Sequence, residues 1–218
     1  LLLLGGVILG ATNVEQGVAA VVCGALVHWA IPPTSGARIS LRDVVSRFGV
    51  ALIGLALARI AVLIWFHAVG ATVQGRFGEF GRLLPASIEN AVSLGGTGIY
   101  SWLGAGWIMV VVVLWQLHDH ELGQHEQPQR WIAAGFGLVI LPALATVTTL
   151  DGSRVFGAVG GVALLVALVW FSEMSDRPER KWILECSAAL MIFGILIPTI
   201  VTTYRGGIRV PWRFVLNL

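Results

Sequence analysis

The feature that most constrains this chain is a series of five long apolar runs. They cover 44–66, 99–117, 131–150, 155–171 and 183–203, and the run 99–117 contains no charged residue. Each is close to the roughly 20 residues that a helix needs to cross a ~30 Å hydrocarbon core. A buried helix of a soluble protein could explain one such run, but it cannot explain five. The sequence therefore predicts an integral membrane protein.

The composition supports this prediction and favours helices over a membrane β-barrel. Charged residues make up 12% of the chain, about half of the ~25% that a soluble domain carries. The segment from Val110 to Leu114 is apolar without alternation, whereas strands of a membrane barrel alternate apolar and polar residues. We therefore expect a single all-α domain over 1–218, a polytopic bundle of about six or seven transmembrane helices, in the inner (plasma) membrane.

The expected helices follow the apolar runs. They cover 1–11, 17–31, 44–69, 98–117, 131–150, 155–171 and 182–204, with a possible short amphipathic helix at 85–94. The first is too short to cross a bilayer and begins at Leu1 rather than Met, which predicts that the N-terminal part of the protein is missing. Gly6/Gly10 and Gly157/Gly161 are each four residues apart, which places each pair on one face and predicts close helix packing within the chain.

Basic residues in the connections between helices give the expected orientation. Two sets of connections alternate between the faces, the first set 32–43, 118–130 and 172–181, and the second set 70–97, 151–154 and 205–218. Each set holds six Lys or Arg, and Arg47 adds one to the first set. Because short cytoplasmic connections carry the excess of basic residues, we place the second set on the outer face.

The first candidate site is the polar stretch Asp151-Gly152-Ser153-Arg154, which lies between two apolar runs. Ionisable groups at membrane depth are costly and usually pair or serve a function. One interpretation is local, because Asp151 could cap the next helix or pair with Arg154 across one turn. The other is functional, with Asp151 as a catalytic carboxylate and Arg154 free to bind an anionic substrate.

The second candidate is a set of arginines assigned to the outer face, with a carboxylate among them. The set contains Arg76, Arg82, Arg205 and Arg209, and the carboxylate is Glu79. A guanidinium binds phosphate through two parallel hydrogen bonds, which a lysine ammonium cannot do. The arginines could therefore bind a lipid pyrophosphate or a phospholipid headgroup, and Glu79 could act as a base. The alternative is that these side chains only extend to lipid headgroups at the interface.

Arg59 differs from the other arginines because it lies in the middle of the apolar run 44–66. A charge at that depth needs a partner or a water-filled cavity. Glu79, Glu89 and Asp151 are candidate partners within the sequence, as is a residue of the missing N-terminal part. Arg59 is therefore included among the candidate substrate-binding residues.

A metal, a cofactor or a nucleic acid is not indicated. Three histidines and three carboxylates between His118 and Glu126 could bind zinc, but their spacing matches no specific metal motif, and a solvated connection is the simpler interpretation. The sequence contains no phosphate-binding glycine loop, no HExxH and no GxSxG. The net charge of +2 gives no reason to expect nucleic-acid binding.

The stretch Leu150-Asp151-x-x-Arg154-Val155-Phe156 resembles an element of polytopic proteins from bacterial surface-polysaccharide clusters, of the O-antigen or exopolysaccharide polymerase type. The resemblance covers about nine residues, from Thr148 to Phe156. It implies an envelope protein that handles polyprenyl-pyrophosphate-linked glycans at the outer face, with Asp151 and Arg154 as the matched positions.

Three hypotheses follow for the function. The first is an enzyme that polymerises or transfers a lipid-linked glycan, in which arginines bind the pyrophosphate and Asp151 or Glu79 is the general base. The second is a non-enzymatic helical subunit of a larger membrane complex. The third is a small transporter, which the short chain and the lack of an inverted repeat make less favourable. In each case the partners include membrane lipids, and in the second they include other membrane subunits.

Overall fold

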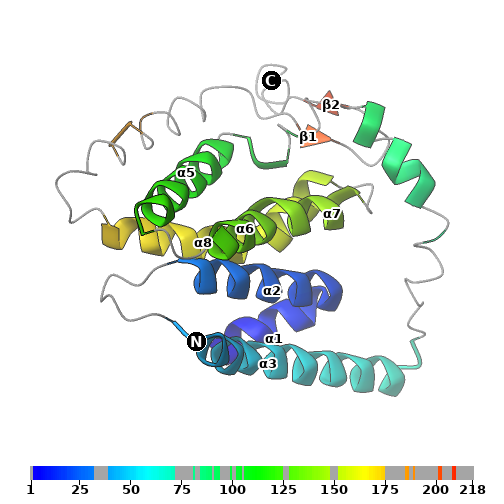
Figure 1. Ribbon diagram of the computed structural model, residues 1–218. Helices are drawn as coiled ribbons and strands as arrows, with labels where there is room; N and C mark the ends of the chain where they lie inside the picture. The colour runs from blue at the N-terminus through cyan, green and yellow to red at the C-terminus, as the bar shows by residue number, and fades with distance from the viewer. Residues whose placement is uncertain are drawn as a thin grey trace.

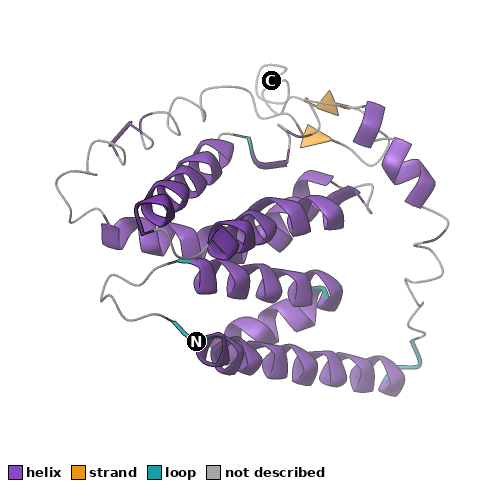
Figure 2. Cartoon of the chain, viewed as in Figure 1, coloured by secondary structure: helices purple, strands orange, loops and turns teal. Residues whose placement is uncertain are grey.

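The computed structural model describes residues 2–31, 39–71, 81, 84–89, 91–93, 99, 102–104, 106–124, 128–147, 152–174, 185–186, 189, 201–202 and 208–209. These residues are almost entirely helical (Figures 1 and 2), which confirms the all-α prediction. The main elements are α1 (Leu2–Thr12), α2 (Val14–Ala30), α3 (Leu41–Ala68), α5 (Gly106–Gln124), α6 (Pro128–Gly135), the π-helix η1 (Phe136–Ile140), α7 (Leu141–Val147), α8 (Gly152–Met174), β1 (Val201–Thr202) and β2 (Ile208–Arg209).

Two of the helices begin at side-chain caps that the sequence supplies. The Asn13 side chain accepts a hydrogen bond of 3.2 Å from the N–H of Gln16, so α2 begins at Val14, three residues before the predicted start. Ser40 accepts a 3.1 Å hydrogen bond from the N–H of Asp43, and its hydroxyl donates to the Asp43 carboxylate at 2.7 Å. Such caps satisfy N–H groups that the first turn of a helix leaves unpaired.

Glycines hold α1 against α3. A Cβ added to Gly6 would collide with the backbone of Ala51, and one added to Gly10 would collide with the backbone of Leu55. Gly54 of α3 is equally close to the backbone of Leu3. Residue numbers rise together on both helices, from the Gly6–Ala51 contact to the Gly10–Leu55 contact, so α1 and α3 run in the same direction. The predicted packing role of Gly6 and Gly10 is confirmed.

The second predicted glycine pair is different. A Cβ on Gly157 or Gly161 would meet no atom within 4 Å, so within the described structure no helix packs closely on these two positions. Close packing of α8 occurs instead through Gly24 of α2, where an added Cβ would lie 2.6 Å from a methyl group of Val162.

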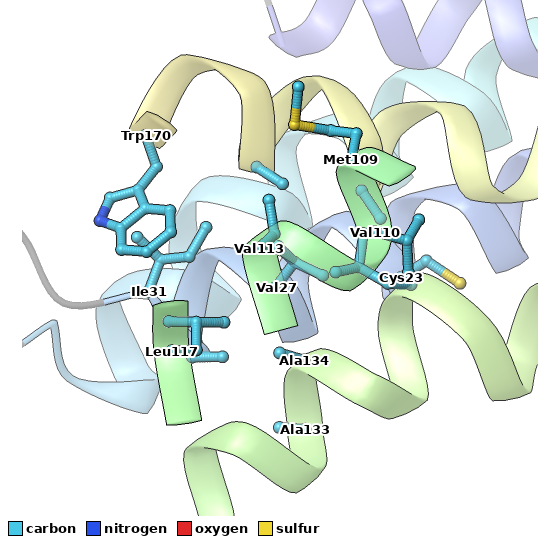
Figure 3. Close-up of a cluster of buried hydrophobic side chains, with 14 of the residues drawn as sticks. Cys23, Val27, Ile31, Met109, Val110, Val113, Leu117, Ala133, Ala134 and Trp170 are labelled. Carbon is cyan, nitrogen blue, oxygen red and sulfur yellow. The ribbon is translucent and has the colours of Figure 1, made fainter. Parts of the chain in front are cut away.

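The main core lies between α2, α5, α6, η1 and α8, as Figure 3 shows for part of it. Its fully buried members include Val27, Val113, Val159 and Ala134. A smaller cluster, with Val44 and others, joins α2 to α3. Helix α2 therefore lies between α3 on one side and α8 on the other (Figure 1).

The helix through residues 128–147 contains a π-helical segment before Pro142. The N–H of Leu141 donates to the carbonyl of Phe136, five residues earlier, instead of four. Proline has no N–H and its ring crowds the preceding turn, so a wider turn removes part of that conflict. One turn after the proline, the Thr146 hydroxyl donates to the Pro142 carbonyl at 2.7 Å.

Successive helices run in alternate directions between two ends of the bundle. At one end, which we call the Trp29 end, α2 and α5 finish and α6 begins, as the contacts of Trp29 with Arg130 and of His118 with Trp131 show. At the other end, which we call the Trp107 end, α5 and α8 begin, and Trp107 contacts Phe156. Helix α3 starts at the Trp29 end, where His28 contacts Phe48.

Two predicted helices are corrected by the structure. The segment 98–117 is broken at Gly104, whose φ of +53° suits glycine, and α5 starts only at Gly106. The segment 182–204 cannot be helical to its end, because Val201 and Thr202 form β1 and pair antiparallel with Arg209 and Ile208. Of the predicted short helix at 85–94, residues 85–89 and 91–93 are described and helical.

Two of the described helices are long and apolar enough to cross a membrane, Leu41–Ala68 and Gln129–Val147. Four shorter apolar helices accompany them, over Leu2–Ala11, Val14–Ala30, Gly106–His118 and Val155–Trp170. The expected membrane character is therefore supported by two candidate spans.

Candidate functional site

Most of the predicted site residues lie outside the described residues. These are Asp151, Glu79, Arg76, Arg82 and Arg205. Arg154 lies in the first turn of α8 and Arg209 in β2, but the description does not extend to their side chains. Arg59 is described in full.

The described elements place the attachment points of these residues at one end of the bundle. Helix α3 ends at Ala68 and α5 begins at Gly106, both at the Trp107 end, and the connection between them carries Arg76, Glu79 and Arg82. Helices α7 and α8, on either side of Asp151, meet at the same end (Figure 1). The hairpin that carries Arg209 also contacts α8 through β1.

Aromatic packing fixes the start of α8, and with it the backbone of Arg154. Phe156 is 1% exposed, and its ring contacts two indole rings. The ring of Trp102 stacks on it at 5.5 Å and 20°, and that of Trp107 lies 5.4 Å away at 49°. The indole N–H of Trp107 donates to the carbonyl of Ile99 at 2.8 Å. Phe156, part of the stretch that resembles a polysaccharide-polymerase element, therefore has a structural role here.

Arg59 lies on the flank of the buried face of α3 and is itself half-buried. Its neighbours Ile60 and Leu63 are exposed apolar side chains. Within the described ranges, neither a hydrogen bond nor an ion pair of its guanidinium is found. Glu89, one of the predicted partners, is described and exposed, and no ion pair joins the two.

A second polar cluster, at the Trp29 end, was not predicted from the sequence. Arg130 is only 7% exposed, and its guanidinium carbon lies 5.8 Å from the centroid of the Trp29 ring. Gln116 of α5, two residues before His118, is 4% exposed. In the sequence, Arg130 is one of the basic residues of the connection 118–130 that were used to predict the orientation. The signal that could have found it is its position directly before Trp131, at the start of an apolar helix.

The same cluster joins α5 to α6. The indole N–H of Trp131 donates to the carbonyl of Leu114 at 3.1 Å, and the ring of His118 meets that of Trp131 edge-on at 5.7 Å. His118 begins the histidine and carboxylate stretch considered for zinc. The other side chains of that stretch lie outside the description, and among the described residues there is no group of three metal-binding side chains.

Comparison with known proteins gives no relative. No protein-family model matches the chain, and neither a curated protein nor a solved structure shows significant similarity to it. The resemblance around Asp151 and Arg154 therefore stays a prediction.

Proposed function

We propose that the chain is a multi-pass protein of the inner membrane that acts in surface-polysaccharide assembly, polymerising or transferring a polyprenyl-pyrophosphate-linked glycan at the outer face. The single observation behind the membrane part of this proposal is the surface of α3. Large apolar side chains are exposed along its whole length, including Ile53, Leu57, Ile60 and Ile64 at 54–64% exposure. Soluble monomers rarely expose an apolar patch of this extent, whereas lipid covers such a surface at no cost.

Five alternating helical segments support the multi-pass arrangement, for which we propose about six or seven spans in all. Helix α3 and the helix through 129–147 are long enough to cross alone. Helices α2, α5 and α8 pack on the latter in one apolar core. Alternation of α2, α3, α5, α6–α7 and α8 puts consecutive connections at opposite ends, which is what a chain that repeatedly crosses a bilayer requires.

The glycan-transfer part of the proposal rests on where the described helices next to the predicted site residues begin and end. The connection with Arg76, Glu79 and Arg82 attaches at the Trp107 end, and so does the stretch with Asp151 and Arg154. Polar groups drawn from separate connections would thus meet at one membrane face. Arginine guanidinium groups at that face could each donate two parallel hydrogen bonds to a pyrophosphate group, whose negative charge increases as it leaves the sugar.

The proposed reaction forms one glycosidic bond and breaks one sugar–phosphate bond. Asp151 or Glu79 accepts the proton of an acceptor hydroxyl, whose oxygen attacks the anomeric carbon. The bond from that carbon to the phosphate oxygen breaks, and the polyprenyl pyrophosphate leaves with the electron pair. Arg154, together with Arg76, Arg82, Arg205 and Arg209, stabilises the negative charge of the leaving group.

The substitution Arg154→Lys tests this function. If Arg154 binds phosphate through its planar fork, lysine loses one charge-assisted bond, and transfer should slow roughly 30- to 1,000-fold. The measurement is glycan chain length and turnover in cells that carry the variant, with protein abundance checked by blot. Arg177→Lys is the matched control, because Arg177 lies in the connection 172–181, which belongs to the first set and is assigned to the cytoplasmic face. This variant should leave the glycan unchanged. Normal glycan in the Arg154→Lys strain at normal abundance would contradict the proposal.

A second candidate function, a non-enzymatic subunit of a larger membrane complex, is favoured by the uncovered part of α3. From Arg59 to Ala68 no residue of this helix is buried, and the helix extends beyond α1 (Figure 1). If this function is correct, glycan should fall only as far as the abundance of the protein falls.

A further inference from the structure

The part of α3 beyond Ala58 has no covering helix among the described residues. Residues from Arg59 to Ala68 are all exposed or half-buried, whereas the preceding half of the helix has a continuous buried face. That buried face ends where α1 ends, because Gly10 of α1 already lies against Leu55. Within the described residues, the rest of α3 is open to lipid or to another helix.

Arg59 lies near the middle of the membrane if the hydrocarbon begins after Arg47, the last charged residue in the first two turns of α3. Arg42, Asp43 and Arg47 are exposed in its first two turns. If the hydrocarbon begins after Arg47, Arg59 lies twelve residues further on, about 18 Å at 1.5 Å per residue. The core is about 30 Å thick. On this placement the guanidinium lies close to the midplane, where an ionised group needs a partner or a water-filled cavity.

Arg59 is also part of a stripe with the spacing of a helix–helix contact. Exposed or half-buried residues recur three and four positions apart along one face of α3, at Val45, Gly49, Leu52, Ala56, Arg59 and Leu63. An alternation of three and four is the repeat of a helix that packs along another helix. Gly49 and Ala56 are small, which allows close approach in lipid, and a Cβ on Gly49 would meet nothing within 4 Å.

Within the described part of the chain, a second copy supplies no opposite charge at the depth of Arg59. The main described helices contain no carboxylate near their middle. Glu15 and Asp43 lie at helix starts, Asp119, Glu121 and Glu173 lie near helix ends, and Glu89 and Glu185 lie outside the main helices. A dimer through α3 would bring two guanidinium groups together instead, which like-charge repulsion opposes. The complement of this face is a different transmembrane helix with an aspartate or glutamate at mid-depth.

We propose that the stripe from Gly49 to Leu63 on α3 docks a transmembrane helix of another protein, and that a mid-membrane carboxylate of that helix pairs with Arg59. The pair would be desolvated, so removal of either charge would leave the other without a partner in lipid. This inference is independent of the glycan chemistry at the Trp107 end, because Arg59 lies in the apolar span and not at the surface.

The test uses the full chain in phosphatidylcholine vesicles with a synthetic leucine–alanine transmembrane peptide that has one central aspartate. Association is measured by energy transfer between labels on the chain and the peptide. The wild-type chain should bind the aspartate peptide roughly tenfold more tightly than the same peptide with asparagine. Arg59→Met should remove this preference, and Arg59→Glu should instead prefer a peptide with central lysine. Arg47→Met, a control on the same helix, should keep the wild-type preference.

Three outcomes would overturn the proposal. The first is equal binding of both peptides to the wild-type chain, as expected if Arg59 reaches lipid phosphates. The second is a preference that survives in Arg59→Met. The third is a preference that appears only after Glu79→Gln or Asp151→Asn, which would show that the partner of Arg59 is in its own chain. Circular dichroism of each variant in the vesicles checks that it is folded.

Discussion

The guanidinium of Arg130 in α6 lies over the indole ring of Trp29 in α2, 5.8 Å from its centroid. These residues are 101 positions apart in the chain, and the contact joins the end of one helix to the start of another. Arg130 is 7% exposed, so its aliphatic stem and its charge are both largely removed from water. The face of an aromatic ring attracts such a cation, more strongly when the pair is desolvated.

Replacement of Trp29 by leucine should lower the stability of the bundle by removing this attraction. A double-mutant cycle of Trp29→Leu and Arg130→Met should give a coupling free energy of about 0.5–2 kcal/mol. The measurement is unfolding in mixed detergent micelles as the denaturing detergent is raised. Trp29→Phe, which keeps an aromatic face, should retain part of the coupling. A coupling free energy of zero would mean that the contact does not stabilise the fold.

The glycine contacts between α1 and α3 should not tolerate a side chain. Gly10→Leu would force two backbones apart and should destabilise the fold by about 1–3 kcal/mol or more, as overpacking does. Gly5→Leu is the matched control on the same helix, because a Cβ there meets no atom within 4 Å. Thermal unfolding in detergent, followed by circular dichroism, compares the two. Equal melting temperatures for both variants would contradict the described packing.

The exposed surface of α3 predicts how the protein fractionates. Expressed in cells, the chain should sediment with membranes, resist extraction by alkaline carbonate and require detergent for release, because its apolar surface is stable only in lipid. Recovery as a soluble monomer without detergent would show that the chain is not an integral membrane protein.

Cysteine labelling of intact cells should establish the orientation of the chain. Single cysteines at Gly78 and Gly206 should react with an impermeant reagent from outside, and one at Asp176 should not. The background needs Cys186→Ser because that thiol is exposed, while Cys23 is buried and should stay unreactive. Labelling of Gly78 and Asp176 from the same side would show that the number of spans between them is wrong. Inversion of all three would exclude the proposed outer-face chemistry.

The sequence could predict most of the helices because each is a local property of its apolar run. In lipid, backbone N–H and C=O groups must be satisfied within the segment, so a long apolar run can only be a helix. The helices predicted at 44–69 and 155–171 correspond to α3 and α8 within a few residues. The predictions failed where local backbone chemistry interrupts a run, at Gly104 with its positive φ and at Val201–Thr202 in a strand.

The candidate site could be predicted less completely. Arg154 and Arg59 could be chosen from the sequence, since charges inside or beside apolar runs are visible without a structure. The sequence offers no comparable reason for the buried pair at the Trp29 end, Arg130 and Gln116, because their burial depends on helices that are distant in the sequence.

What the sequence determined by itself is therefore that this chain is a bundle of apolar helices, with polar groups concentrated in the connections between them. What only the tertiary structure decided is which faces meet. Gly6 and Gly157 belong to similar pairs in the sequence, yet Gly6 lies against the backbone of α3 and Gly157 faces open space. A run of apolar residues determines a helix through backbone hydrogen bonds between residues four positions apart. Which other helix it packs against depends on whether the surfaces of two segments far apart in the sequence fit together.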